Sequence, residues 1–143
     1  MPQQGLSVGR DTTLVIQTPT GPLQIPKLTT FRKKQDTTQE RVKLITGLSV
    51  HLRFFDGWSG SFGVNRAGPE IESYFDQLET DYYSGINEQP CQIYETVSEP
   101  SGAISQWRYD GVVLSLDDGG EAAGDASVKL SLTFMATRRK RIS

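Results

Sequence analysis

The longest strictly alternating run in the chain is the feature that most restricts its fold. From Ala126 to Ala136, apolar residues occupy every second position and the residues between them are mostly polar. Successive side chains of a β-strand point to opposite faces, so this pattern predicts a strand with one buried face and one polar face. A helix would scatter the same apolar residues around its axis. The run therefore indicates a β-rich chain.

Strand patterns also occur along the rest of the chain. Leu48, Val50, Leu52 and Phe54 alternate with polar residues in a second strand that ends before Gly57. Turn sequences rich in Gly, Pro and Asp separate the segments. Strands joined in this way pair mostly with antiparallel neighbours, so an antiparallel β-barrel or sandwich is expected. Weaker strand patterns lie at Thr12–Thr18, Lys27–Arg32, Arg41–Thr46, Gly60–Asn65, Gln92–Val97 and Ile104–Leu116.

One segment, between Pro69 and Gly85, has helical spacing. Pro69 suits the first turn of a helix, and Gly85 suits its C-terminal end. The predicted fold class is therefore mainly β (α+β), with one flanking α-helix. The apolar residues that follow the helical period are Ile71, Tyr74, Phe75, Leu78 and Tyr82. The opposite face is acidic and carries Glu72, Asp76, Glu79 and Asp81.

Charge is segregated along the chain. The length of 143 residues suits a single domain, which we place at 1–143. Residues 1–53 carry a net charge of +5, residues 54–125 carry −12, and residues 126–143 carry +5. Within a monomer these blocks can compensate one another. Alternatively, copies with separate basic and acidic surfaces can dock head to tail, which produces rings or filaments.

Two strongly polar stretches lie beside strand patterns. Residues 33–40 lie between two of them and are interpreted as the tip of an extended hairpin standing away from the body. The basic C-terminal end, 138–143, follows the best strand directly and is interpreted as a solvated tail. Nucleic-acid recognition by this tail is not expected, since the pI is about 5.4 and no aromatic-rich binding motif accompanies it.

No arrangement of residues supports an enzyme, a cofactor site or a metal site. Cys91 is the only cysteine and His51 the only histidine, and no motif joins them. Cys91 is expected to pack as a small apolar residue, and His51 to lie on the polar face of its strand. The glycines of the segment DGWSGSFG lack the spacing of a phosphate-binding loop. The apolar runs are too short for a membrane span, and we expect no secretory signal.

Four segments together resemble the tail tube proteins of contractile-tailed bacteriophages and related prophages. They are a Gly-rich strand ending in Arg66, an acidic helix ending in Tyr82-Tyr83-Ser84-Gly85, a hairpin at 107–114, and the closing strand at 125–139. That last strand ends in a Phe-x-Ala-x-Arg-like sequence. The resemblance covers roughly residues 10–140, and the N-terminal half matches only in outline.

The resemblance implies a structural protein of a virion tail that is assembled in the cytoplasm of a bacterial host. Six copies would form a ring by sheet extension, and rings would stack into a hollow tube. The expected partners are other copies, the tail sheath, the baseplate and terminator proteins, and a tape measure protein in the lumen. DNA would pass through without specific binding, and neither a membrane nor a cofactor is expected.

The resemblance also implies two sets of contact residues. The first is a protruding loop, about 32–42, that reaches the adjacent ring through Arg32, Lys33, Lys34, Gln35, Asp36, Glu40 and Arg41. The second comprises charge contacts between subunits or rings, made by Glu72, Asp76, Glu79 and Asp81 and by Arg138, Arg139, Lys140 and Arg141.

Two alternatives remain open at this point. The first is a related assembly protein, either the tube subunit of a non-contractile tail, a secretion system or a phage-like particle, or a baseplate or tail-completion protein. The second, from another class, is a small ligand-binding β-barrel. Its pocket would be formed by Trp58, Phe62, Trp107 and Tyr109.

Overall fold

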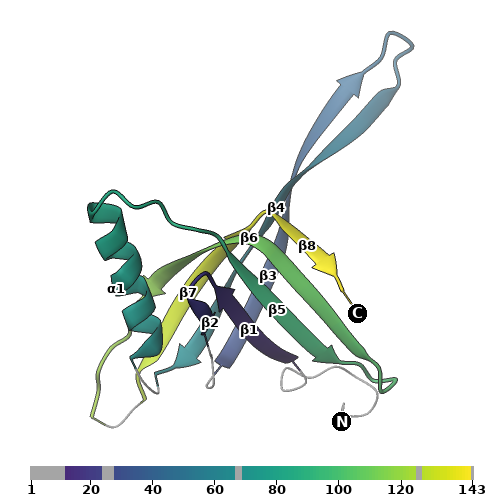
Figure 1. The fold of residues 1–143 in the computed structure, drawn as a ribbon. Coiled ribbons are helices and arrows are strands. Elements are labelled where there is room, and N and C mark those ends of the chain that lie inside the picture. The colour runs from purple at the N-terminus through teal and green to yellow at the C-terminus, as the bar shows by residue number, and fades with distance from the viewer. Residues whose placement is uncertain (1–11, 24–27, 67–68, 125–126, 143) are drawn as a thin grey trace.

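A computed structural model describes residues 12–23, 28–66, 69–124 and 127–142. Eight strands and one helix are present in this part of the chain (Figure 1). Every strand pairing is antiparallel, so the predicted fold class, mainly β with one helix, is confirmed. The elements are β1 (Thr12–Thr18), β2 (Gly21–Leu23), β3 (Leu28–Lys43), β4 (Ser49–Asn65), α1 (Glu70–Tyr83), β5 (Cys91–Ser98), β6 (Ile104–Asp118), β7 (Lys129–Ala136) and β8 (Arg138–Arg141).

The strands form one twisted sheet in the order β2-β1-β5-β6-β7-β4-β3, with β8 paired to β6 beside this path. Strand β6 joins two halves of the sheet, because its first part pairs with β5 and β8 and its second part pairs with β7. Gly111 lies where the partners change and has a φ of +63°. A Cβ atom there would lie 2.4 Å from Thr137 Oγ1, so only glycine fits this corner.

The core lies between the two halves of the sheet and is dominated by aliphatic and aromatic side chains. In β7, Leu130, Leu132, Phe134 and Ala136 are buried, which confirms the buried face predicted from the alternating run. Ala126, the first residue of that run, lies outside the described residues. The rest of the core includes Ile16, Phe62, Val64, Ile93, Tyr109, Val112 and Leu114.

Helix α1 packs beside the sheet and matches the predicted helix closely. Ile71 is buried, and Tyr74 and Phe75 pack against the core. The helix ends just before Gly85, which has a φ of +80°. Tyr82, expected on the apolar face, is instead exposed, because the last turn of the helix extends beyond the core.

Strands β3 and β4 form a hairpin far longer than the sequence patterns indicated. The segments predicted at Lys27–Arg32 and Arg41–Thr46 both contribute to the single strand β3, but Lys27 lies outside the described residues and residues 44–46 lie in the turn. Likewise, residues 49–54 and 60–65 of the two predicted strands belong to the single strand β4, and Leu48 lies in the turn before it. The interpretation of residues 33–40 as a hairpin tip is therefore wrong, because the turn lies at residues 44–48. Cross-strand backbone hydrogen bonds hold a polar segment extended even where both faces meet water.

Two short strands were not predicted. β2 is the three-residue strand Gly21–Leu23, and β8 consists of Arg138–Arg141, part of the segment interpreted from the sequence as a solvated tail. Residues Arg138 to Arg141 pair with Asp110 to Trp107 of β6. The composition of this segment gives no strand signal, and it is extended because β6 offers it a free edge.

Candidate functional site

The outer half of the β3–β4 hairpin projects from the body as a two-stranded ribbon (Figure 1). We define the arm as residues 37–56, all of which are exposed. It begins where β7 ends, because Trp58 of β4 pairs with Ala136, the last residue of β7. Beyond that point β4 pairs only with β3. A shift in the pairing register between Asp36 and Thr37 marks the base of the arm.

One face of the arm is apolar. In an antiparallel pair, directly opposite residues lie on the same face, and the face alternates along the strand. Val42 lies opposite Val50, so both share a face with Leu52 and Phe54, two and four residues further along β4. The apolar row is formed mainly by β4, since Glu40 and Thr38 of β3 lie opposite Leu52 and Phe54. Leu52 is 41% exposed and Phe54 51% exposed. An exposed apolar row on a paired ribbon is typical of a surface that another molecule covers.

The other face of the arm is basic. Arg41 lies opposite His51, and Gln39 lies opposite Arg53. Residues 41–55 contain no acidic residue, and the two carboxylates of the arm, Glu40 and Asp56, lie nearer its base. At the end of the ribbon, Leu44, Ile45 and Leu48 form an exposed apolar tip, and the side chain of Ile45 is fully exposed. The arm therefore presents an apolar face, a basic face and an apolar tip.

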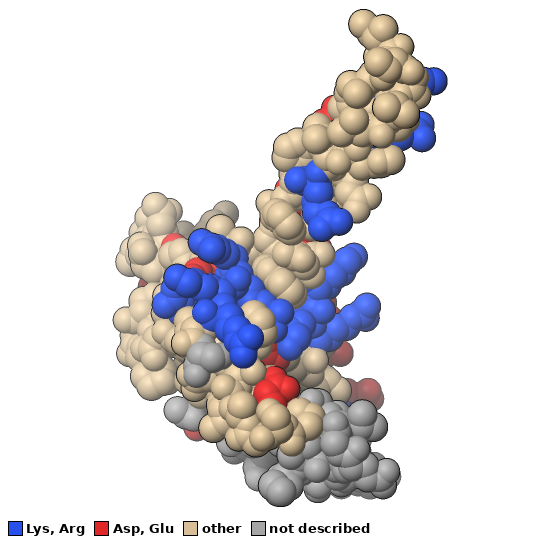
Figure 2. Space-filling view, turned by 90° about the vertical axis from the view of Figure 1, so that its right-hand side faces the viewer, with Lys and Arg blue, Asp and Glu red and all other residues tan. Residues whose placement is uncertain are grey.

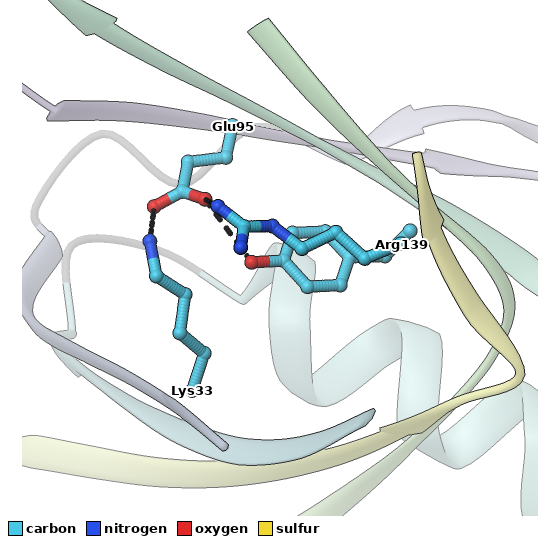
Figure 3. Close-up of polar contacts among 4 residues, drawn as sticks. Lys33, Glu95 and Arg139 are labelled. Atoms are coloured by element: carbon cyan, nitrogen blue, oxygen red, sulfur yellow. Dashed lines mark hydrogen bonds and ion pairs between the residues drawn. The ribbon is translucent and has the colours of Figure 1, made fainter. Parts of the chain in front are cut away.

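A buried carboxylate holds the base of this hairpin to the body. Glu95 of β5 is 1% exposed and forms an ion pair with Lys33 of β3. Arg139 Nη2 of β8 lies 3.7 Å from Glu95 Oε1, and Figure 3 shows Lys33 and Arg139 converging on this carboxylate. Tyr109 donates a hydrogen bond of 3.1 Å to the same oxygen, and burial raises the pKa of this phenol so that it stays protonated.

Arg139 is also enclosed by aromatic rings. Its guanidinium carbon lies 3.7 Å from the ring centre of Trp107 and 4.8 Å from that of Trp58. Such stacking is favourable for a planar cation and locks its orientation. In this structure, Lys33 and Arg139, both expected to contact other subunits, bond within their own chain. No local pattern indicates this cluster, because its members come from five different strands.

The remaining predicted contact residues lie on the surface, at two separate places. Lys and Arg side chains gather on the face that includes β8, next to the root of the arm (Figure 2). Helix α1 lies on the opposite side of the sheet from β8 (Figure 1). There Glu72 pairs with Arg66, and Asp81 accepts a 2.9 Å hydrogen bond from Gln77. The exposed residues of the predicted sets are Arg32, Lys34, Gln35, Glu40, Arg41, Asp76, Glu79, Arg138, Lys140 and Arg141.

A groove beside α1 was not predicted. It has a volume of about 420 Å³ and lies between the helix, the β1–β2 turn and the segment after the helix. Its apolar wall is formed by residues such as Pro22, Leu78 and Ile86. Residues 18–23 and residues 70–89 come together to build it, so no local pattern indicated its presence.

The aromatic residues proposed for a ligand pocket serve another purpose. Phe62 and Tyr109 are buried in the core, and Trp58 and Trp107 stack on Arg139. Within the part of the chain that the structure describes, no group of three or more His, Cys, Asp or Glu residues is placed to hold a metal ion. No helix in the described ranges is long and apolar enough to cross a membrane.

Cys91 is buried, as expected, and its sulfur lies 2.9 Å from Tyr74 Oη. Burial raises the pKa of the thiol, so at any pH a smaller fraction is the reactive thiolate than in an exposed cysteine. We expect the native protein at pH 8 to react with iodoacetamide at least about tenfold more slowly than the unfolded chain does. Mass spectrometry over a time course measures this rate, and equal rates in the two states would contradict the packing.

The comparisons with known proteins identify the fold. No protein-family profile matches the sequence, and no curated protein matches it. A structure of the anti-feeding prophage tube-terminating cap superposes with a TM-score of 0.63 at 9% identity, over 100% of this chain and 95% of that one. The 6-fold symmetrised baseplate of the same prophage gives 0.59 at 9% identity, over 99% and 98%. The sheath–tube complex of an extracellular contractile injection system gives 0.55 at 11% identity, over 91% and 88%. The chain thus has the fold of components of phage-tail-like injection particles.

Proposed function

We propose that this chain is the structural subunit of a tail tube, in which copies form rings and rings stack into a hollow tube inside a contractile sheath. The observation that carries the proposal is the arm. Its twenty residues are all exposed, yet one face carries a row of four apolar side chains and the tip is apolar as well. Such a surface is a liability on a free monomer and is useful on a subunit that is covered by the next copy.

Ring formation is supported by the open edges of the sheet. The sheet path ends at β2 and β3, and β8 is paired to β6 alone. A backbone edge with free N–H and C=O groups can accept a strand from a neighbouring subunit. Six-fold symmetry is the natural choice, because a structure with the same fold comes from a 6-fold symmetrised assembly.

Stacking is supported by the separation of charge. The basic face beside β8 and the acidic helix α1 lie on opposite sides of the body (Figure 1). Copies that meet head to tail therefore bring opposite charges together, which favours one orientation of the rings. In a particle, the outer surface would meet the sheath and the lumen would hold a tape measure protein and pass DNA, with the baseplate and terminator proteins at the two ends.

A capping role is the second candidate, favoured by the TM-score of 0.63 to a tube-terminating cap. A terminator or baseplate protein would form one ring and stop. Negative-stain electron microscopy of the purified protein over a concentration series separates the two roles. We expect rings of six and hollow stacked tubes at high concentration. Isolated rings at every concentration would favour the cap, and monomers at every concentration would overturn both.

A further inference from the structure

The groove beside α1 and the tip of the arm are complementary in charge and in chemistry. Three acidic residues, Glu70, Asp81 and Glu88, line the groove, and none of the lining residues is Lys or Arg. The tip carries three exposed aliphatic side chains, Leu44, Ile45 and Leu48. Three basic residues flank the tip in the sequence: Arg41 and Lys43 precede it, and Arg53 follows it. An apolar tip with a basic surround thus matches an apolar groove with an acidic surround.

We infer that the groove is the receptor for the arm tip of a second copy of this chain. The tip does not reach the groove of its own chain, because the arm points away from the side of the body on which α1 lies (Figure 1). The arm extends by about 25 Å beyond its base, enough to reach a neighbouring body. A groove of about 420 Å³ is in the size range of sites that hold small molecules, so it accommodates aliphatic side chains.

The contact joins two different surfaces, tip and groove, so it is heterologous. After two copies dock, one copy still has a free groove and the other a free tip, so the interaction propagates from copy to copy. This inference deepens the proposed tube function and rests on it, because it assigns the surface that receives the arm. Burial of the apolar tip stabilises the contact. The acidic residues that line the groove favour the basic arm over other apolar segments.

Disulfide cross-linking between two variants of the full chain tests the contact. One variant carries Ile45→Cys, and the other carries Gln77→Cys, an exposed groove residue on α1. The matched control replaces the second variant by Glu79→Cys, which is equally exposed and lies two residues along the same helix but outside the groove. Positions i and i+2 of a helix point in nearly opposite directions. The native Cys91 is buried and does not compete.

Under mild oxidation we expect the Ile45→Cys and Gln77→Cys pair to give at least about tenfold more mixed dimer than the control pair. Adding Glu88→Lys to the groove variant is expected to lower this yield about two- to fivefold, whereas Asp117→Lys, an exposed acid outside the groove, leaves it unchanged. Electron microscopy of the same unoxidised mixture shows whether tubes form.

The outcomes separate the inference from the proposed function. Tubes with equal cross-linking of both pairs, or with cross-links only between two Ile45→Cys copies, would overturn the groove as receptor and leave the tube function standing. A mixed dimer specific to Gln77→Cys in a sample without tubes would support the contact and count against the tube. Neither tubes nor cross-links would overturn both.

Discussion

Placing two carboxylates on the apolar face of the arm, by Leu52→Glu with Phe54→Glu, will abolish tube formation and leave the folded body intact. Both side chains are exposed in the single chain, at 41% and 51%, so their replacement removes little burial from the monomer. In an assembly each buried side chain contributes about 1.5–3 kcal/mol. Losing two of them raises the concentration required for assembly at least about a hundredfold, before the cost of burying charge is added.

Sedimentation and electron microscopy measure the assembly, and thermal unfolding of the same sample measures the body. The matched control is Leu52→Met with Phe54→Leu, which keeps the face apolar and should form tubes. Normal tubes from the double glutamate variant would mean that the apolar face is not an assembly surface. A large loss of thermal stability would instead mean that the arm supports the fold.

Replacing Arg139 by alanine will destabilise the protein by about 3 kcal/mol. The change removes one of the two cations beside the buried Glu95 carboxylate, at 3.7 Å, and the planar group stacked on Trp107 at 3.7 Å. It also removes side-chain contacts of β8 with the body, although the backbone pairing of β8 with β6 remains. Denaturant unfolding measures this loss of stability. The same measurement on the arm variant Leu52→Glu with Phe54→Glu should show no comparable loss.

Arg138→Ala is the matched control for this prediction, because Arg138 is the preceding residue of the strand and is exposed. Its effect should stay within about 0.5 kcal/mol. Arg139→Lys keeps the charge but loses the planar stacking group, so its loss of stability should lie between those of Arg139→Ala and Arg138→Ala. A loss below about 1 kcal/mol for Arg139→Ala would show that Lys33 alone satisfies Glu95.

Several features of the fold could be predicted because their signal is local. The period-two alternation of β7 and the helical period of residues 69–85 each depend on which side of one element faces the core, and the structure confirms both. The antiparallel class followed from short turns between strands. The proposed tail function came from a resemblance, and the structural comparison shows the shared fold.

The arm shows where local patterns mislead. The apolar alternation of residues 48–54 was correct as a strand signal, but it indicated a buried face, and the structure leaves this face exposed. A period-two pattern indicates only that other residues will cover the apolar face of the strand. It does not distinguish coverage by the same chain from coverage by another. Residues 33–40 were interpreted as a hairpin tip because they are polar, but they belong to strand β3. An extended ribbon tolerates polar side chains on both faces.

The sequence by itself determined the β-rich class, the single helix and the separation of charge, since each depends on the order of residues along one segment. Only the tertiary structure decided that Lys33 and Arg139 serve the buried Glu95 and that β8 is a strand. It also built the groove beside α1 by bringing the β1–β2 turn against the helix and the residues that follow it. The physical reason is that ion pairs, strand edges and grooves depend on distances between residues far apart in the chain, and these distances exist only after the strands have paired.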